Sequence, residues 1–265
     1  MHSTEIISIF ASLIYLLQKS MRAIIIGATS GLGREVAINL LCEGWHVGIA
    51  GRREELLEEI ASNPEFGTNV VYERIDVTAE DAVEGVERLA RRLGGMDLFV
   101  NVSGVGFQNP TLDSAVEKKI FDVNGYGFMR MVGWAYNYFK REWGEGHIAV
   151  ISSIAGTKPL GTAAAYSATK RMQSHYITAL AQLARMEGVN VKFTDIRPGF
   201  AATDILNPNK HYPMMMKKEY AGRLATEAIL KKKRVAVIDW KFAILTFFWS
   251  LIPRCVWERL TFVKN

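Results

Sequence analysis

Two side chains with complementary chemistry stand four residues apart in the segment Tyr166-Ser-Ala-Thr-Lys170. On a helix, residues at positions i and i+4 lie one above the other on the same face. A lysine ammonium so close to a phenol favours the phenolate, so the spacing predicts a Tyr166 pKa below its reference value of about 10. Tyr166 is then a candidate general acid or base near neutral pH.

A serine precedes this tyrosine at a place suited to hold a substrate. The apolar run over residues 148–151 predicts a strand, and Ser152 and then Ser153 follow it directly. Open parallel sheets bind their ligands beyond the carboxyl ends of the strands. The Ser153 hydroxyl can donate there to a carbonyl oxygen beside the Tyr166 hydroxyl and stabilise charge that develops during hydride transfer. Ser152 offers the same group, but the spacing to Tyr166 favours Ser153.

Three glycines form a turn that suits a phosphate group. The segment Gly27-Ala-Thr-Ser-Gly31-Leu-Gly33 lies between an apolar run and an amphipathic stretch. Glycine permits positive φ and lets backbone N–H groups approach a pyrophosphate, while the following helix supplies partial positive charge. This strand–turn–helix context favours dinucleotide binding over a merely structural turn. The predicted contacts are Gly27, Thr29, Ser30, Gly31, Leu32 and Gly33.

The end of the second predicted strand carries two arginines, Arg52 and Arg53, and no acid before Glu54. NAD-binding units usually place an acid here for the ribose hydroxyls, whereas an arginine accommodates a 2′-phosphate. A carboxylate would repel that phosphate, and a guanidinium binds it through parallel charge-assisted hydrogen bonds. The sequence therefore favours NADP(H) over NAD(H), with Arg52 the stronger candidate. The alternative is that both arginines begin a solvated helix.

Short apolar runs alternate with longer amphipathic ones from Arg22 onward, which is typical of repeated βαβ units. The predicted strands are Ala23–Ile26, His46–Ala50, Val70–Arg74, Leu98–Asn101, Ile148–Ile151, Val191–Ile196 and Val235–Ile238. The predicted helices are Gly31–Cys42, Arg53–Ile60, Ala79–Leu93, Ala115–Trp143, Tyr166–Glu187 and Glu219–Lys231. Seven strands and six crossovers predict one α/β domain, a doubly wound seven-stranded parallel sheet of the Rossmann fold.

The glycine spacing G-x-x-x-G-x-G, followed by Ser153 and Tyr166-x-x-x-Lys170, resembles the short-chain dehydrogenase/reductase (SDR) family in its compact form. The resemblance covers roughly residues 21–240 and supports the same Rossmann-type domain. It implies that the amide of Asn124 holds a water that relays protons to Lys170. The alternative for Asn124 is a helix kink beside Gly125.

The resemblance also implies further cofactor contacts. Asp76 and Val77 would meet the adenine, although an aspartate capping the next helix is nearly as good an interpretation. Asn101-Val-Ser-Gly104 matches the family's Asn-Asn-Ala-Gly element only at its first and last positions, since Val102 replaces the second Asn. The contacts implied beside the nicotinamide are Pro198, Gly199 and Thr203.

These residues together predict an NADPH-dependent oxidoreductase that reduces a ketone or aldehyde to an alcohol, or the reverse. Tyr166 would be the proton donor, Ser153 the donor to the carbonyl oxygen, and Lys170 both the tuner of the Tyr166 pKa and a ribose contact. A non-catalytic NADP-binding sensor or scaffold is the alternative, disfavoured because both tyrosine and lysine are present. Larger epimerases and dehydratases are disfavoured by length.

The expected substrate is an apolar or amphipathic small molecule. Phe107, Phe200, the methionines 214–216 and an aromatic C-terminal tail would supply apolar walls to its pocket. Methionine in particular suits a pliable apolar surface. Apolar walls are usual in ligand pockets, so they do not name the compound.

Composition excludes several classes of protein. The chain has 265 residues, 49% of them hydrophobic and 22% charged, which excludes disordered and collagen-like chains. A net charge of +5 requires no nucleic-acid partner. Cys42 and Cys255 cannot form a disulfide framework and have no metal-ligand spacing, so we expect a reducing, cytoplasmic compartment and no metal site.

Both ends of the chain are apolar but too short to span a bilayer, with uncharged runs at residues 6–17 and 242–252. Residues 1–20 are predicted to be an N-terminal extension or frayed helix. Residues 241–265 are predicted to form an apolar and basic tail that packs on the domain or a subunit interface. Peripheral membrane contact is disfavoured because the run 242–252 has no charge on any face.

The predicted helices Ala115–Trp143 and Tyr166–Glu187 carry apolar residues on more than one face. Trp134 and Tyr138 belong to the first stretch and Tyr176 to the second. One face must pack on the sheet, so the surplus predicts a partner helix. Together with the family resemblance, this favours a homodimer or homotetramer.

Overall fold

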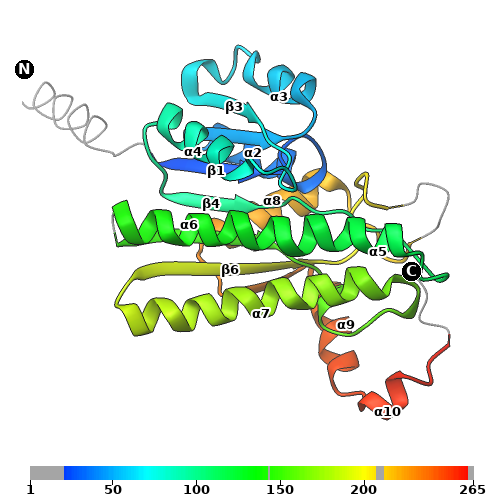
Figure 1. Ribbon diagram of the computed structural model, residues 1–265. Coiled ribbons are helices and arrows are strands. Elements are labelled where there is room, and N and C mark those ends of the chain that lie inside the picture. Colours follow the sequence, from blue (N-terminus) through cyan, green and yellow to red (C-terminus); the bar gives the residue numbers. More distant parts are fainter. Residues whose placement is uncertain (1–20, 143, 207–211, 262–265) are drawn as a thin grey trace, which may run out of the picture.

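A single sheet of seven parallel strands organises the computed structural model, which describes residues 21–142, 144–206 and 212–261 (Figure 1). The strand order is β3-β2-β1-β4-β5-β6-β7. This confirms the predicted doubly wound sheet of Rossmann type in a single domain. The predicted extension 1–20 lies outside the described residues.

The strands are β1 (Arg22–Ile26), β2 (His46–Gly51), β3 (Val70–Arg74), β4 (Leu98–Asn101), β5 (Glu145–Ile151), β6 (Asn190–Pro198) and β7 (Val235–Ile238). β1 pairs with β2 on one side and β4 on the other, so the direction of winding reverses between β1 and β4. At such a reversal the carboxyl ends of the strands open a crevice for a ligand. β5 begins at Glu145, three residues before the predicted start at Ile148. The prediction missed this part because Glu145 and Gly146 are not apolar.

The helices are α2 (Gly31–Cys42), α3 (Glu54–Ala61), α4 (Ala82–Leu93), α5 (Ser114–Phe121), α6 (Phe128–Glu142), α7 (Ala164–Glu187), α8 (Lys218–Leu230), α9 (Trp240–Ser250) and α10 (Arg254–Trp257). Side chains of α2, α3, α8 and α9 join the core on one face of the sheet. Those of α4, α6 and α7 join the core on the other face, and Figure 1 shows α6 and α7 running side by side across it.

β1 shows why the strands are apolar without alternation. Ala23 and Ile25 belong to the core on the α2 side, while Ile24 and Ile26 belong to the core on the α4 side. A strand covered on both faces needs apolar residues at every position. Full burial of one such isoleucine contributes about 1.5 to 3 kcal/mol to stability.

The predicted helix 115–143 is interrupted. A π-helical segment, η2 (Asp122–Gly127), separates α5 from α6. The Phe128 N–H bonds to Val123 O, five residues back, where an α-helix would bond four residues back. Asn124, one of the predicted site residues, lies in this segment and is fully buried.

The aromatic residues expected to face a partner helix pack within this chain. The Trp134 ring lies 6.1 Å from Phe99 and 5.3 Å from Tyr138, measured between ring centroids. Tyr176 lies 5.9 Å from Phe128. Tyr138 is buried, whereas Trp134 and Tyr176 stay partly exposed, and assembly into a dimer or tetramer stays a prediction.

The C-terminal tail is anchored to the loop that follows β5. The Trp249 indole N–H donates to Thr157 Oγ1 at 3.0 Å, and that of Trp257 donates to Pro159 O at 2.9 Å. The two indole rings meet edge to face, 5.5 Å apart. Within the described residues, neither these helices nor any other have the length and apolar character needed to cross a membrane.

A buried histidine in β5 makes the stability of the fold depend on pH. His147 Nε2 lies 2.9 Å from Thr194 Oγ1, and burial together with the Lys232 charge lowers the pKa of His147 to about 4. Between pH ~6.5 and 4 the unfolded chain binds a proton that the folded chain excludes, so stability falls as pH falls. Over that range we expect His147 to account for about 3 kcal/mol of lost stability.

Urea unfolding at pH 7 and pH 4.5 tests this expectation. In His147→Gln, which has no titrating ring, the free energy of unfolding should fall less between the two pH values than in the original chain. The exposed His175 provides the control, because His175→Gln should leave the pH dependence unchanged. Identical pH dependence in His147→Gln and the original chain would contradict the assignment.

Candidate active site

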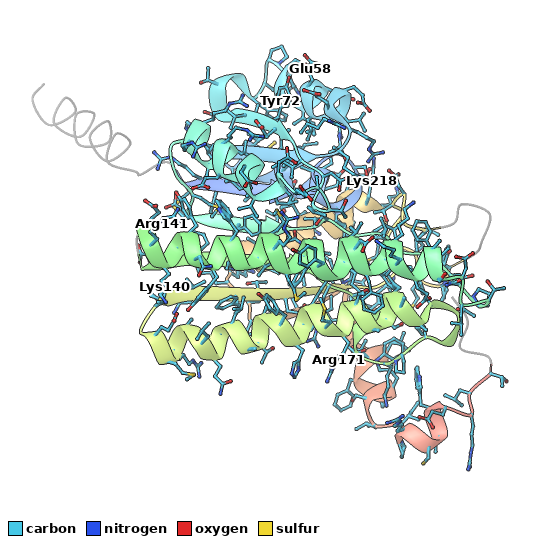
Figure 2. All side chains as sticks on the ribbon, in the orientation of Figure 1. Glu58, Tyr72, Lys140, Arg141, Arg171 and Lys218 are labelled. Carbon is cyan, nitrogen blue, oxygen red and sulfur yellow. The ribbon has the colours of Figure 1, made fainter. Side chains whose placement is uncertain are left out.

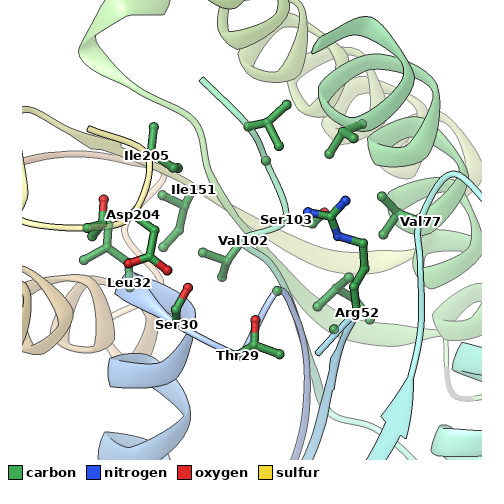
Figure 3. Close-up of a pocket in the computed structure, with 18 of the residues that line it drawn as sticks. Thr29, Ser30, Leu32, Arg52, Val77, Val102, Ser103, Ile151, Asp204 and Ile205 are labelled. Carbon is green, nitrogen blue, oxygen red and sulfur yellow. The ribbon is translucent and has the colours of Figure 1, made fainter. Parts of the chain in front are cut away.

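A cavity of about 350 Å³ lies at the carboxyl ends of the central strands (Figure 3). It is enclosed by the glycine turn, the ends of β2 and β3, and the loop after β4. Twelve of the residues predicted to hold a dinucleotide line it: Gly27, Thr29, Ser30, Gly31, Leu32, Arg52, Arg53, Asp76, Val77, Gly104, Lys170 and Thr203.

The glycine turn has the backbone shape that a phosphate requires. Gly27 has φ +92°, and a Cβ there would lie 2.7 Å from Ser103 N. At Gly33 a Cβ would lie 2.0 Å from Gly27 O, so this glycine permits close packing and lies outside the cavity lining. α2 begins at Gly31, which lines the cavity, so the positive end of the helix lies at the cavity, and no acid in its first turn offsets that charge. The turn therefore fits a pyrophosphate group.

The two arginines after β2 are placed differently. Arg53 Nη2 donates to Thr29 Oγ1 at 3.0 Å and to Ser30 Oγ at 2.6 Å, so Arg53 braces the glycine turn. Figure 3 shows the Arg52 side chain extending toward Ser103, across the cavity from Asp204. Both arginines line the cavity, and Arg53 is the one bound to the glycine turn.

Charges at the end of β3 complete this side of the cavity. Partial burial opposes ionisation of Asp76, but hydrogen bonds from Thr78 and the charges of Arg52 and Arg74 together keep its pKa below the usual value. Arg74 Nε also donates to Arg52 O at 3.3 Å. The sequence analysis missed Arg74, although its place two residues before Asp76 and opposite Gly51 could have indicated it.

A second cavity, of about 890 Å³, adjoins the first. Its lining is mostly apolar and includes Ser153 and Tyr166. The two cavities share four lining residues: Gly106, Phe107, Asp204 and Ile205. Since Lys170 lines the first cavity and Tyr166 the second, one face of α7 serves both.

The two candidate serines have separate partners. The Ser153 hydroxyl lies near the Tyr166 hydroxyl and acts to lower the pKa of Tyr166, and the Ala155 N–H donates to Ser153 Oγ at 3.1 Å. Ser152 instead donates to Asp195 Oδ1 at 2.5 Å. The structure therefore brings Ser153, and not Ser152, to the tyrosine.

The prediction that Lys170 lowers the pKa of Tyr166 is wrong. Burial raises the pKa of Tyr166 above its ordinary value and outweighs the opposing effect of Ser153. Lys170 Nζ lies 5.8 Å from the centre of the Tyr166 ring and donates to Ile151 O at 3.0 Å. Burial lowers the pKa of Lys170 itself to about 8, against the opposing charge of Asp195.

Asn124 and Lys170 are joined by a residue that the sequence analysis missed. Lys170 Nζ donates to Gln173 Oε1 at 3.1 Å, and Gln173 Nε2 donates to the main-chain oxygen of Asn124 at 2.9 Å. All three side chains are buried. The Asn124 amide itself holds Val105, donating to Val105 O at 2.7 Å and accepting from Val105 N at 2.8 Å. Gln173 lies three residues after Lys170, so its position on the same helix face was the available signal.

The remaining predicted cofactor residues lie at the edges of the site. Asn101 is buried behind the cavity, where its Oδ1 accepts from Ser103 Oγ at 3.1 Å. Pro198 ends β6, and Gly199 lines the second cavity against Phe242.

The methionines do not form the expected wall of the substrate cavity. Met216 is buried and bridges to Ala201, while Met214 and Met215 are exposed. The chain lines the cavity here with Tyr212 and Pro213 instead. Sequence alone could not show which part of this segment turns inward.

Comparisons with known proteins agree with this geometry. The family model of short chain dehydrogenases matches residues 21–212. An uncharacterized oxidoreductase of Myxococcus xanthus is 30% identical over 241 residues, which cover 89% of this chain and 94% of the relative. A farnesol dehydrogenase of Aedes aegypti is 30% identical over 196 residues, which cover 69% of this chain and 78% of the relative.

Two solved structures are similar along most of their length. An alcohol dehydrogenase from the archaeon Thermococcus sibiricus, complexed with 5-hydroxy-NADP, has a TM-score of 0.71 and 26% identity, covering 83% of this chain and 95% of that one. A 3-ketoacyl-(acyl-carrier-protein) reductase from Brucella melitensis, complexed with NADH, has a TM-score of 0.73 and 26% identity, covering 83% and 96%. The two neighbours thus carry different nicotinamide cofactors.

Proposed function

The chain belongs to the short-chain dehydrogenase family, and from this premise we propose that it is an NADPH-dependent oxidoreductase that reduces a ketone or aldehyde to an alcohol, or the reverse. The observation that carries this proposal is the junction of the two cavities along one face of α7. Lys170 lines the cavity with the phosphate-binding turn, and Tyr166 with Ser153 lines the apolar one. A dinucleotide and an apolar substrate would therefore meet at Tyr166.

Each side chain has a step that its chemistry suits. The nicotinamide cofactor, when bound, supplies the hydride. Ser153 Oγ donates a hydrogen bond to the substrate carbonyl oxygen, where negative charge develops. Tyr166 gives its hydroxyl proton to that oxygen, and burial supports this role because a raised pKa keeps the phenol protonated at neutral pH. Lys170, held between Ile151 O and Gln173 where it lines the first cavity, would contact the ribose of the cofactor.

The first cavity fits the cofactor in charge as well as shape. The turn at Gly27 and the start of α2 would hold the pyrophosphate. Arg52, with Arg74 beside it, would hold the 2′-phosphate of NADP, and Asp76 with Val77 would meet the adenine. Pro198, Gly199 and Thr203 would complete the nicotinamide end. Gly104 would contact the cofactor where it lines the cavity, and Asn101 would support this loop through Ser103. Since the solved neighbours carry an NADP derivative in one case and NADH in the other, the choice of NADP rests on the arginines of this chain.

The preference for NADP(H) is testable at Arg52. We expect NADPH to bind at least tenfold more tightly than NADH, a difference of about 1.4 kcal/mol. Arg52→Gln should weaken NADPH binding and leave NADH binding unchanged, because only NADPH carries the phosphate. Fluorescence titration measures both affinities. Arg91→Gln, at an exposed position of α4, is the control. Equal affinity of the original chain for the two cofactors would contradict the prediction.

Oxidation of NADPH in the presence of a panel of aldehydes, ketones and 3-oxoacyl thioesters tests the proposed reaction. We expect turnover with apolar or amphipathic members of the panel, in keeping with the farnesol dehydrogenase among the relatives. Tight NADPH binding without turnover of any member would instead favour a non-catalytic sensor or scaffold.

Assembly and location complete the proposal. A homodimer or homotetramer is proposed from the family and from the partly exposed rings of Trp134 and Tyr176. A cytoplasmic location is proposed from cysteine usage, and Cys42 and Cys255 are both free and exposed. Light scattering at micromolar concentration tests the assembly.

A further inference from the structure

Helix α9 exposes a continuous apolar stripe on its outer face. The stripe consists of Trp240, Ile244, Phe247, Phe248 and Leu251, which are 65%, 49%, 61%, 62% and 64% exposed. These positions follow the spacing i, i+4, i+7, i+8 and i+11, so they lie on one side of the helix. Contiguous exposed apolar surface of this kind marks a site of interaction.

The opposite face of α9 holds the helix on the protein. Phe242, Thr246 and Trp249 are buried there, and Trp249 donates its hydrogen bond to Thr157. The stripe is therefore turned outward by the fold. An isolated interfacial helix needs a charged face toward water, and residues 242–252 have none. In the folded protein that face of α9 is covered by the domain, so the helix needs no charged face of its own.

Positive charge accompanies the stripe. The charged residues between positions 240 and 261 are Lys241, Arg254, Glu258 and Arg259. The single acid, Glu258, is paired with Arg254 at 2.6 Å. This charge complements an anionic lipid surface. A symmetric contact with a second copy would instead bring the same cations together, which opposes association.

The same helix walls the apolar cavity. Leu245 and Trp249 of α9, with Ile252 just beyond it, line the cavity that also contains Tyr166. One helix thus separates an outward apolar stripe from the candidate substrate site. An apolar compound dissolved in a bilayer would have a short path along α9 to Tyr166.

We propose that α9 and α10 dock on the surface of an anionic lipid bilayer with the stripe inserted at the interface, and that the substrate is an apolar carbonyl compound dissolved in that bilayer. Figure 2 shows these two helices with their side chains at the lower edge of the protein, below α7. Trp and Phe suit the interface because their rings are large and apolar. The substrate class rests on the proposed function, whereas the docking does not.

Vesicle flotation tests the docking. The full chain should float with vesicles of phosphatidylcholine and phosphatidylserine and bind vesicles of phosphatidylcholine alone at least tenfold less. The double variant Phe247→Glu with Phe248→Glu should lose at least tenfold in binding to the anionic vesicles. The matched control, Leu183→Glu with Met186→Glu on α7, adds the same charge at exposed apolar positions and should bind normally. Circular dichroism and NADPH titration confirm that both variants are folded.

Other outcomes overturn the docking. Absence of binding to anionic vesicles, or equal loss in both double variants, would do so. If the stripe instead covers a second copy of this chain, the original chain would not bind the vesicles. Phe247→Glu with Phe248→Glu would then lower the mass measured by light scattering without vesicles.

A comparison of two substrates separates this inference from the proposed function. For a long-chain aldehyde in anionic vesicles, the stripe variant should show a KM raised at least tenfold. Its kcat/KM for a short water-soluble aldehyde should stay unchanged, because the reacting groups are intact. An unchanged KM in vesicles overturns the substrate class alone. Vesicle binding without NADPH oxidation on any aldehyde overturns the proposed function and leaves the docking intact.

Discussion

Tyr166→Phe is expected to lower kcat by a factor of about 10² or more while NADPH binding is retained. The substitution removes only the hydroxyl near Ser153 and leaves the ring packed against Gly106. Without that hydroxyl the carbonyl oxygen receives no proton from the protein as the hydride arrives. Steady-state kinetics on the best substrate of the panel, with a titration of NADPH, measure both quantities.

Tyr176→Phe is the control for this experiment, because it makes the same change on the same helix away from both cavities. Its kcat should match that of the original chain. A Tyr166→Phe variant that works at nearly the original rate would show that another group donates the proton, and the proposed mechanism would then be wrong.

Asp195→Ala is expected to lower the free energy of unfolding by about 3 to 5 kcal/mol, the usual cost of breaking a buried ion pair from one side. Asp195 is 1% exposed and pairs with Arg197 Nη2 at 2.6 Å. It also accepts the hydrogen bond from Ser152. Its loss leaves a largely buried guanidinium without its anion and a buried hydroxyl without this acceptor.

Urea unfolding measures the loss, and an exposed ion pair gives the comparison. Glu59 pairs with Arg34 at 3.0 Å, with side chains that are 60% and 32% exposed. Glu59→Ala should cost less than about 1 kcal/mol, because solvent screens the pair. Similar losses in the two variants would show that burial does not set the strength of the Asp195 pair.

The sequence predicted the fold well because its strongest signals are local. The apolar run of β1, the glycine turn and the start of α2 follow one another in a single segment, so their order alone indicates a dinucleotide-binding unit. Tyr166 and Lys170 share a helix face by spacing. Ser153 follows a strand that ends at the same edge of the sheet.

The features that the sequence did not predict depend on contacts between distant segments. The distance between Tyr166 and Lys170 is governed by Ile151 O, which draws the ammonium away from the ring. The direction of the Tyr166 pKa then follows from burial, which spacing along the chain does not show. Gln173 likewise acquires its place from the main-chain oxygen of Asn124, 49 positions away.

The tail illustrates a second limit. Apolar residues surround most of helix α9, so its sequence has little periodicity from which a buried and an exposed side can be assigned. The anchoring of Trp249 and Trp257 to the loop after β5 makes that assignment. This anchoring decides which apolar residues of α9 form the exposed stripe and which line the cavity.

The π segment between α5 and α6 amounts to one extra residue inserted into a continuous helix. The wider turn absorbs that residue locally, so α5 and α6 need not rotate, but Phe128 N–H bonds to Val123 O and not to Asn124 O. The Asn124 carbonyl is thereby available to accept from Gln173. Deleting one residue from Asp122–Gly127 would restore a regular helix and return the carbonyl of Asn124 to the helical ladder, away from Gln173. The position of an active-site acceptor in this protein is thus set by one extra residue of chain, and a change in length can destroy it without changing the type of any side chain at the site.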